Sequence, residues 1–482
     1  MWGRATVVLD VGKTLSKLSL WAPDGQLLHR RRRQNSRIDA GHYAGLDAAG
    51  IEAWLVETLR DFARVADVSA IIPVAHGAAA AIVRDGLLVQ PPLDYEQSIP
   101  AAIRRKYDAQ RDAFALSGSP ALPDGLNLGA QPYYLETLNH YLLAGNATIL
   151  PWPQYWSWLL SGVAASEVTS LGCHTDLWRP LAATPSELSV SRGWAAHMAP
   201  RVGAGAVLGH ITKEWAEKTG LPRDVRVHCG LHDSNAALLA ARAFREIDDR
   251  DATVLSTGTW FVGMRAAISG SVADLASLPE TRDCLVNVDP FSRPVPSARF
   301  MGGREIELLT GADESRIDIP SDQPALLRGV PNVLASDAMI LPTYIRNTGP
   351  FPNSRGRWLS IPGDETQRRT AVGLYAALVA DVSLDLIGAR ECLLIEGRFA
   401  ECEVFARALA ALRPDTTVYV GHANSDVSFG ALRLLDPALP PPSSLSRVLP
   451  LTDDLNDYRQ RWRALSSAGA RSEIVAHTDH DC

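Results

Sequence analysis

Apolar and polar segments alternate regularly in the N-terminal part of the chain. Thr6–Leu9 is an apolar run that predicts a buried strand, and the polar segment Asp10–Thr14 predicts a turn into a second strand at about Lys17–Trp21. Gly50–Val65 has apolar residues at helical spacing, and Ser69–Val74 predicts the next strand. A hairpin followed by a helix and a strand is typical of a layered α/β domain.

The middle of the chain holds another strand and helix, followed by a charged segment. Val225–Val227 is the predicted strand, Gly230–Asp233 is the turn after it, and Ala236–Phe244 has the pattern of a helix. Arg245–Asp251 then interrupts the apolar pattern, and Thr253–Leu255 begins a second alternating region as a strand. The charged segment therefore predicts a domain boundary.

The second region repeats the alternation of helices and strands. Its predicted elements are a helix at about Arg369–Ala389, a strand at Cys392–Ile395, a helix at about Ala400–Leu412 and a strand at Thr416–Val420. Pro440–Pro442 ends this part, and the segment after it has one apolar helical face that we expect to pack against the body. That face is formed by Leu455, Tyr458, Trp462 and Leu465. The predicted domains are residues 1–245 and 246–440, with a tail at 441–482 that holds the packing helix.

A short internal similarity relates the two halves. Val8–Thr14 reads VLDVGKT and Val254–Trp260 reads VLSTGTW, with valine, leucine and glycine at matching positions. In each case a buried strand is followed at its end by an oxygen-bearing side chain and then a glycine. Three matches in seven positions are weak evidence alone. The pattern nevertheless suggests two related halves with two glycine-containing turns around a shared cleft.

Composition narrows the class of protein. Hydrophobic residues make up 46% and charged residues 21% of the 482 positions, as in an ordinary globular chain of two domains. The formal net charge of -7 argues against a surface that binds nucleic acid. The longest apolar stretch, Ser69–Val83, is interrupted by Pro73 and His76 and is too short for a membrane span. No signal-peptide core precedes Asp10, and the six cysteines form no CxxC pair, so we expect reduced thiols and a cytoplasmic location.

The polar hairpin offers the groups that phosphate transfer requires. Asp10 supplies a carboxylate, Gly12 allows close backbone approach, and Thr14 and Lys17 supply a hydroxyl and an ammonium group. A P-loop is excluded, because that motif needs a glycine where Val7 stands. An ordinary polar hairpin tip remains the alternative.

Other positions carry weaker signals of the same chemistry. Ser256–Trp260 offers hydroxyls and a glycine at the start of the second half, while Gly302-Gly303 and Gly397 stand at turns that suit the approach of a nucleotide. Asp233 follows a strand and a glycine and opens a helix, so it is either a carboxylate held at a cleft or a helix N-cap. The tryptophans 152, 156 and 158 form either a subsite wall or plain core.

Taken in order, these segments resemble the FGGY family of carbohydrate kinases over residues 6–435. The polar hairpin is similar to the family's first phosphate motif, and Ser256–Trp260 is similar to its second. His76 and the glycine after it resemble the step that contacts sugar in xylulose kinases, and Asp94 falls in a polar sugar-binding region. Gly230–Asp233 matches the position of the catalytic base.

The resemblance implies two ribonuclease-H-like, actin-like α/β domains with an active-site cleft between them and a hinge near residues 245–251. It also implies ATP and Mg²⁺ as cofactors, a sugar as the other substrate, and no nucleic-acid or membrane partner; a homodimer is left open. Asp233 would be the catalytic base and also touch sugar, His76 and Asp94 would bind sugar, and Asp10 would hold the metal. The implied phosphate and nucleotide contacts are Gly12, Thr14, Lys17, Thr257, Gly258, Thr259, Gly303 and Gly397.

The chain departs from the family pattern at three places that bear on substrate choice. Lys13 stands where a small residue is usual, Glu396 replaces the first glycine of the adenosine turn, and Glu401 stands where some members have an amide. The family's Trp-x-Asp-x-Arg sugar segment is replaced by Leu93–Glu96. We expect a ketose substrate, either a 6-deoxyketohexose such as L-fuculose or L-rhamnulose, or a ketopentose such as xylulose or ribulose. A non-catalytic sugar-binding regulator and an actin-like ATPase module are the alternatives.

Overall fold

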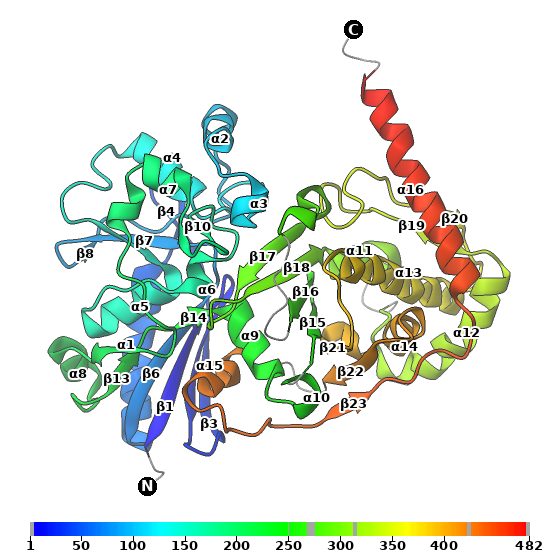
Figure 1. Cartoon of the computed structure of the whole chain (residues 1–482). Coiled ribbons are helices and arrows are strands. Elements are labelled where there is room, and N and C mark those ends of the chain that lie inside the picture. The colour runs from blue at the N-terminus through cyan, green and yellow to red at the C-terminus, as the bar shows by residue number, and fades with distance from the viewer. Residues whose placement is uncertain (1–3, 249, 268–274, 312–315, 422–425, 479–482) are drawn as a thin grey trace. The chain divides into compact units, whose positions relative to one another are not determined.

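The computed structural model describes residues 4–248, 250–267, 275–311, 316–421 and 426–478, and the chain divides into two compact units (Figure 1). The first unit comprises Met1–Ala243, Leu285–Val295 and Asp426–Pro442. The second comprises Phe244–Cys284, Pro296–Ser425 and Ser443–Cys482. This division begins close to the charged segment that the sequence analysis used as a boundary. It differs in giving residues 285–295 and 426–442 to the first unit.

A seven-stranded sheet forms the centre of the first unit, in the order β12-β13-β6-β1-β2-β3, with β14 also paired to β6. β1 pairs with β2 in an antiparallel hairpin and with β6 in parallel, so the predicted hairpin is confirmed. The strands are β1 Ala5–Val11, β2 Leu15–Trp21, β3 Leu27–Gln34, β6 Val68–Ala75, β12 Val207–His210, β13 Arg226–His228 and β14 Leu231–His232.

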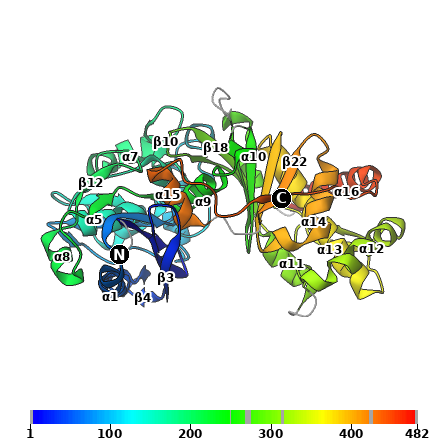
Figure 2. The same ribbon diagram turned by 90° about the horizontal axis from the view of Figure 1, so that it is seen from below.

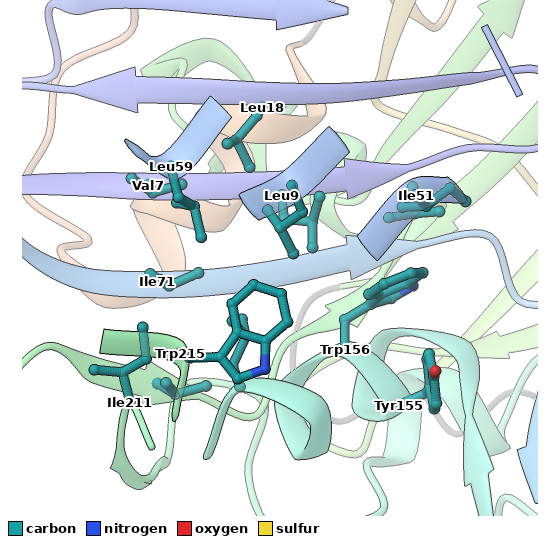
Figure 3. Close-up of a cluster of buried hydrophobic side chains, with 14 of the residues drawn as sticks. Val7, Leu9, Leu18, Ile51, Leu59, Ile71, Tyr155, Trp156, Ile211 and Trp215 are labelled. Carbon is teal, nitrogen blue, oxygen red and sulfur yellow. The ribbon is translucent and has the colours of Figure 1, made fainter. Parts of the chain in front are cut away.

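Helices cover both faces of this sheet, and the alternation of side chains along β1 explains why. Val7 and Leu9 lie in one buried cluster with residues of α1 Ala48–Val65, α5 Trp152–Ser161 and α8 Lys213–Thr219. Figure 3 shows part of this cluster, with Trp156 and Trp215 beneath the strands. Val8 lies in a different cluster on the opposite face. Because successive strand residues point to opposite faces, a strand buried on both sides must be apolar throughout.

The opposite face is covered by α9 and α15. α9 spans Asp233–Ala241 and α15 spans Val427–Leu435, and the two helices lie side by side (Figure 2). Gly430 allows this packing, since a Cβ there would stand 1.7 Å from the carbonyl oxygen of Ala236. This contact is the reason why residues 426–442 belong with the first unit although they follow the second unit's strands in sequence.

The second unit contains most of a sheet of the same design, whose edge residues 285–295 are counted with the first unit. Its order is β17-β18-β16-β15-β21-β22-β23, with β15 antiparallel to β16 and parallel to β21. The strands are β15 Ala252–Thr257, β16 Phe261–Ala266, β17 Cys284–Val288, β18 Pro294–Phe300, β21 Cys392–Gly397, β22 Thr417–Gly421 and β23 Leu445–Arg447. The packed helices include α11 Gly302–Thr310, α12 Gln323–Ala335, α13 Glu365–Leu386 and α14 Glu403–Leu412, of which α13 contacts the other three (Figure 2).

The two sheets repeat one topology. β3-β2-β1-β6-β13 in the first unit corresponds to β18-β16-β15-β21-β22 in the second, with a central strand that has an antiparallel neighbour on one side and a parallel neighbour on the other. Gly12 and Gly258 follow the central strands β1 and β15 at the same place. The short sequence similarity therefore marks a repeat of the whole sheet.

The C-terminal helix packs as its apolar face predicted. α16 spans Asn456–Thr478, and Tyr458 and Trp462 on its first turns are buried. The Tyr458 hydroxyl donates to the Ala338 carbonyl oxygen at 2.7 Å, and the Trp462 indole donates to that of Ile340 at 2.7 Å. Asp381 of α13, fully buried, accepts hydrogen bonds from arginines on α16, so apolar burial and ion pairs both fix the helix.

The remaining composition-based expectations concern cysteines and membrane segments. Among the described residues, Cys173, Cys229, Cys284, Cys392 and Cys402 are buried and form no disulfide. Cys482 lies outside the described residues. In the part of the chain that the structure covers, no helix is both long and apolar enough to span a bilayer.

Candidate active site

The first unit brings two predicted carboxylates to one edge of its sheet. Asp10 is the sixth residue of β1 and stands beside Val74 of β6, which in turn pairs with Leu231 of β14. Asp233 follows two residues after Leu231 as the first residue of α9. Parallel strands end at a common edge, so this register places Asp10 and the start of α9, which Asp233 opens, at the same edge of the sheet.

Asp233 is not the helix cap that the sequence left as an alternative. The N-cap of α9 is His232, whose side chain makes no capping hydrogen bond. The Asp233 side chain is 29% exposed, and its Oδ1 lies 3.2 Å from His232 Nε2. Burial lowers the pKa of His232 to about 4, so the ring is neutral at pH 7. Asp233 forms no ion pair with a lysine or arginine in the described part of the chain.

The two carboxylates share an unusual electrostatic setting. Burial raises the pKa of Asp10 to about 6, against the opposing effect of Lys17, whose Nζ lies 3.0 Å from Asp10 Oδ2. Burial likewise raises the pKa of Asp233 to about 6. The negative charge of Asp233 adds to the upward shift of the Asp10 pKa, so the two groups are close enough to repel each other.

This pair suits a divalent cation that keeps most of its water. Mg²⁺ binds through one or two carboxylates together with phosphate oxygens and waters, so a large protein cage is unnecessary. No cluster of three or more metal-ligating side chains occurs among the described residues. Asp10 is buried, acidic and repelled by Asp233, and a cation beside it would relieve that repulsion. The residues therefore fit the metal.

A pocket of about 140 Å³ lies beside the polar hairpin in the first unit. Two predicted sugar-binding residues, His76 and Asp94, line it together with Gly12 and Thr14 of the hairpin. His76 is 8% exposed and its Nδ1 has no hydrogen-bond partner among the described groups. Burial lowers the pKa of His76 to about 3, so the ring is neutral, and the buried Nδ1 has a hydrogen bond left to make. Trp152 also lines the pocket, so it serves both as core and as wall.

Four alternating charges form a ring at this pocket. Asp94, which is fully buried, pairs with Lys13 and with Arg37, the latter at 2.9 Å between Nε and Oδ2. Glu96 pairs with Arg37 and lies 3.8 Å from Lys13 Nζ. The Lys13 ammonium also stands 4.5 Å from the centre of the Tyr95 ring. Lys13, which departs from the family pattern, thus reaches from the phosphate hairpin into the pocket.

The second unit brings its predicted nucleotide residues together around one turn. Thr257 ends β15, and its hydroxyl donates to the Glu396 carbonyl oxygen at 2.5 Å and accepts from the Phe399 N–H at 3.1 Å. A Cβ on Gly397, whose φ is +89°, would stand 2.2 Å from the Thr257 carbonyl oxygen. A Cβ on Gly303 would stand 2.0 Å from that of Gly258. Both glycines are thus required by contact with the turn itself.

Gly258 differs from the other two glycines. A Cβ built on Gly258 would meet its nearest neighbour, the Trp260 carbonyl oxygen, only at 3.9 Å. Thr259, the next residue, is exposed. The turn at 257–259 therefore has one open face, where the exposed Thr259 is accessible to a phosphate. The Gly258 N–H is used within the turn, where it donates to the Trp260 carbonyl oxygen at 3.0 Å.

Comparison with known proteins now identifies the chain. Residues 249–442 match the family model described as "Carbohydrate kinase FGGY, C-terminal domain". A solved structure of a carbohydrate kinase from Novosphingobium aromaticivorans is 56% identical, covers 95% of this chain and 100% of its own, and superposes with a TM-score of 0.92. The chain belongs to the FGGY family of carbohydrate kinases. It is therefore a phosphotransferase that acts on a sugar hydroxyl, and kinases of this family use ATP as the phosphate donor.

More distant kinases share the fold. Xylulose kinase from Rhodospirillum rubrum is 17% identical, with a TM-score of 0.78 over 98% of this chain and 100% of that one. Glycerol kinase from Plasmodium falciparum, solved with ADP, is 12% identical, with a TM-score of 0.78 over 99% of each chain. No curated protein matches the chain. At these identities the likeness concerns the fold, and it confirms the predicted pair of actin-like α/β domains.

The kinase also contains site residues that the sequence analysis missed. Nothing in the local sequence of Arg37 distinguishes it from an exposed loop arginine. His232 stands directly before Asp233, and its local sequence predicts only a residue of the turn. Thr169 and Glu167 are buried behind that turn, and the one available signal was a glutamate within an otherwise apolar and hydroxyl-bearing stretch.

The two glutamates that complicated the nucleotide prediction have different environments. Glu396 is 3% exposed at the end of β21, and its backbone carbonyl accepts the Thr257 hydroxyl. Glu401 is exposed, just before α14. The replacement of a glycine by Glu396 therefore leaves the turn at Gly397 intact.

Proposed function

We propose that this kinase transfers the terminal phosphate of ATP to a hydroxyl of a ketose, either a 6-deoxyketohexose such as L-fuculose or L-rhamnulose or a ketopentose such as xylulose or ribulose. The observation that carries the proposal is the contrast between two carboxylates. Asp10 is almost fully buried and paired with Lys17, whereas Asp233 is partly exposed and has no cationic ion-pair partner among the described residues. Asp233 is thus the carboxylate that can accept a proton.

Asp233 acts as the general base in this proposal. A pKa of about 6 leaves it ionised at pH 7 yet more basic than an ordinary aspartate. It orients the attacking hydroxyl and takes its proton late in the transfer, because phosphoryl transition states are loose. The Lys17 ammonium and the Thr14 hydroxyl, on the same hairpin as Asp10, stabilise charge on the transferring phosphoryl group.

The metal would be held by Asp10, directly or through water. When bound, Mg²⁺ supplies positive charge that neutralises the phosphate oxygens. Lys17 keeps Asp10 oriented, since its ammonium donates to Oδ2 at 3.0 Å. Support for this role comes from the mutual repulsion of Asp10 and Asp233, which an added cation would remove.

Sugar recognition is assigned to the pocket of the first unit. The unpartnered Nδ1 of His76 either accepts a hydrogen bond from a sugar hydroxyl or donates one to it, according to the tautomer of the ring. The ring of Lys13, Asp94, Arg37 and Glu96 has two positive and two negative members, so it carries no net charge. A neutral polyhydroxy sugar suits such a ring better than a sugar acid, whose carboxylate would face Asp94 and Glu96.

Nucleotide binding is assigned to the second unit. The exposed Thr259 supplies donors for phosphate oxygens, as Thr14 does in the first unit. Gly258 and Gly12 leave room for the phosphate, and their own N–H groups donate within the turns, to the carbonyl oxygens of Trp260 and Leu15. Gly303 and Gly397 support the turn of the second unit indirectly. Because neither has a side chain, the backbone of residues 257–259 can pack directly against the end of β21 and the start of α11.

The test is a panel of ketoses, aldoses, polyols and sugar acids in an assay of ADP release with ATP and Mg²⁺. The expected result is ADP release that depends on one or a few neutral ketoses. Release without any sugar would favour the ATPase module, and tight sugar binding without ADP release would favour the regulator. A preference for a sugar acid would overturn the assignment of the charge ring.

A further inference from the structure

The turn that delivers Asp233 is supported from behind by a buried polar chain. The His232 N–H donates to the Thr169 hydroxyl at 2.9 Å. That hydroxyl donates in turn to Glu167 Oε2 at 2.5 Å. Thr169 and Glu167 are both fully buried.

The direction of these hydrogen bonds is fixed by chemistry. A backbone N–H can only donate, so the Thr169 hydroxyl must accept from His232. Its single proton goes to Glu167 Oε2, because that oxygen already accepts from two N–H groups and so carries no proton of its own. The same Glu167 oxygen accepts from the N–H groups of Thr169 and Ser170, at 2.9 and 3.2 Å, which holds the carboxyl group still. The Thr169 hydroxyl consequently has one orientation.

We propose that Thr169 is a positioning residue for the base, acting through the His232 backbone, with Glu167 fixing the orientation of its hydroxyl. The peptide between His232 and Asp233 is the junction of β14 and α9, and the side chain of the N-cap residue, His232, makes no capping hydrogen bond there. Thr169 therefore holds the backbone of His232, the residue before Asp233, by a hydrogen bond. This inference rests on the proposed role of Asp233.

The anchored segment is one where small displacements matter. Gly230, with a φ of +81°, packs so tightly that a Cβ would stand 2.1 Å from the Pro73 carbonyl oxygen, which fixes the start of the turn. The His232 ring is confined as well, since a Cβ on Gly77 would stand 2.8 Å from its Nε2. Thr169 fixes the other end of the turn. A base displaced by about 1 Å can cost about 100-fold in rate.

The experiment compares Thr169→Val with Thr169→Ser and with Thr219→Val. Valine keeps the shape of threonine and removes the hydroxyl, whereas serine keeps the hydroxyl. Thr219 is the matched control, because it is a buried threonine of α8 whose hydroxyl donates to the Trp215 carbonyl oxygen at 2.6 Å and accepts from the Leu221 N–H at 3.4 Å. kcat, both KM values and the melting temperature are measured for each folded enzyme.

We expect Thr169→Val to lower kcat at least 10-fold while the KM values for sugar and ATP change less than 2-fold, and Thr169→Ser to restore kcat to within 3-fold. Thr219→Val should lower the melting temperature and leave kcat within 2-fold. If Thr169→Val does not fold, Thr169→Ala replaces it in the same comparison. A folded variant without the hydroxyl that keeps wild-type kcat overturns the inference, as does an equal kcat loss in Thr219→Val.

Asp233→Asn in the same assay separates the two proposals. If Asp233→Asn loses activity but Thr169→Val does not, the positioning role fails and the base remains. If Asp233→Asn retains activity, the proposed base is wrong, whatever Thr169→Val does.

Discussion

Replacement of Asp233 by asparagine gives a prediction whose magnitude follows from the structure. Burial raises the pKa of this carboxyl from 3.8 to about 6, so the folded protein binds its proton more tightly than the unfolded chain does. Each pKa unit corresponds to about 1.4 kcal/mol, so ionised Asp233 costs the folded state about 3 kcal/mol above pH 7. Asparagine has a similar shape and carries no charge. Asp233→Asn should therefore fold and be more stable than the wild type.

The pH dependence of this difference has a definite sign. A raised carboxyl pKa contributes stability that is fully present below the unfolded-state pKa of 3.8 and is lost as the pH rises through about 6. The stability advantage of Asp233→Asn should thus be less than about 1 kcal/mol near pH 4 and about 3 kcal/mol at pH 8. Urea unfolding at several pH values measures it. Asp61→Asn, at an exposed helix position, is the matched control.

Activity should move in the opposite direction. The amide cannot accept a proton, and general-base catalysis contributes about 10²–10⁴-fold, so kcat should fall at least about 100-fold. In the wild type, kcat/KM for sugar should decline as the pH falls below about 6, because the base becomes protonated. A variant that is more stable at pH 8 yet turns over sugar normally would refute the role of Asp233. A variant with a stability difference that is constant with pH would refute the electrostatic reasoning.

Three further predictions concern the pocket and the nucleotide turn. Lys13→Met removes one cation from the charge ring and leaves the buried Asp94 with Arg37 alone. The KM for sugar should therefore rise about 10-fold while the KM for ATP stays constant. Steady-state kinetics with each substrate varied measure both values, and a change in the ATP KM instead would contradict the prediction. His76→Ala should lower kcat/KM for sugar by about 10- to 100-fold, again at constant ATP KM, because each lost or unpaired hydrogen bond costs about 1–3 kcal/mol; calorimetry showing unchanged sugar affinity would count against it. Gly397→Ala should destabilise the protein by about 2–4 kcal/mol, since the new Cβ would clash with the Thr257 carbonyl oxygen at a positive φ; a urea midpoint equal to that of the wild type would show that the backbone relaxes.

The expected effect of Gly397→Ala differs from the effect that the sequence alone would predict. Gly397 was predicted to leave room for a nucleotide, and on that basis a bulky substitution would weaken ATP binding alone. The structure fills the space with the Thr257 carbonyl group, so a substitution there threatens the fold of the second unit first. A glycine at a turn indicates that other atoms come close to its backbone. The sequence does not say whether those atoms belong to a ligand or to the protein's own backbone.

Local pattern determined much of the architecture. The apolar run before Asp10 and the run ending at Val74 became β1 and β6, because a strand buried on both faces must be apolar at every position. The helical spacing of Tyr458 and Trp462 correctly predicted a helix packed by one face, since that spacing is the geometric consequence of 3.6 residues per turn. Such features depend on neighbours in sequence, so the sequence alone contains them.

Tertiary structure decided which residues meet. α15 lies far along the chain from α9, yet Gly430 packs against Ala236, so the chain returns to its first unit after the strands of the second. Lys13 and Asp94 are distant in sequence and share an ion pair, and the Thr169 hydroxyl supports the residue before Asp233. Electrostatic energies and hydrogen bonds depend on distances of a few ångströms and on burial. Those quantities are set only when separate elements pack together, and for that reason the chemistry of single residues was readable from the sequence while their partners were not.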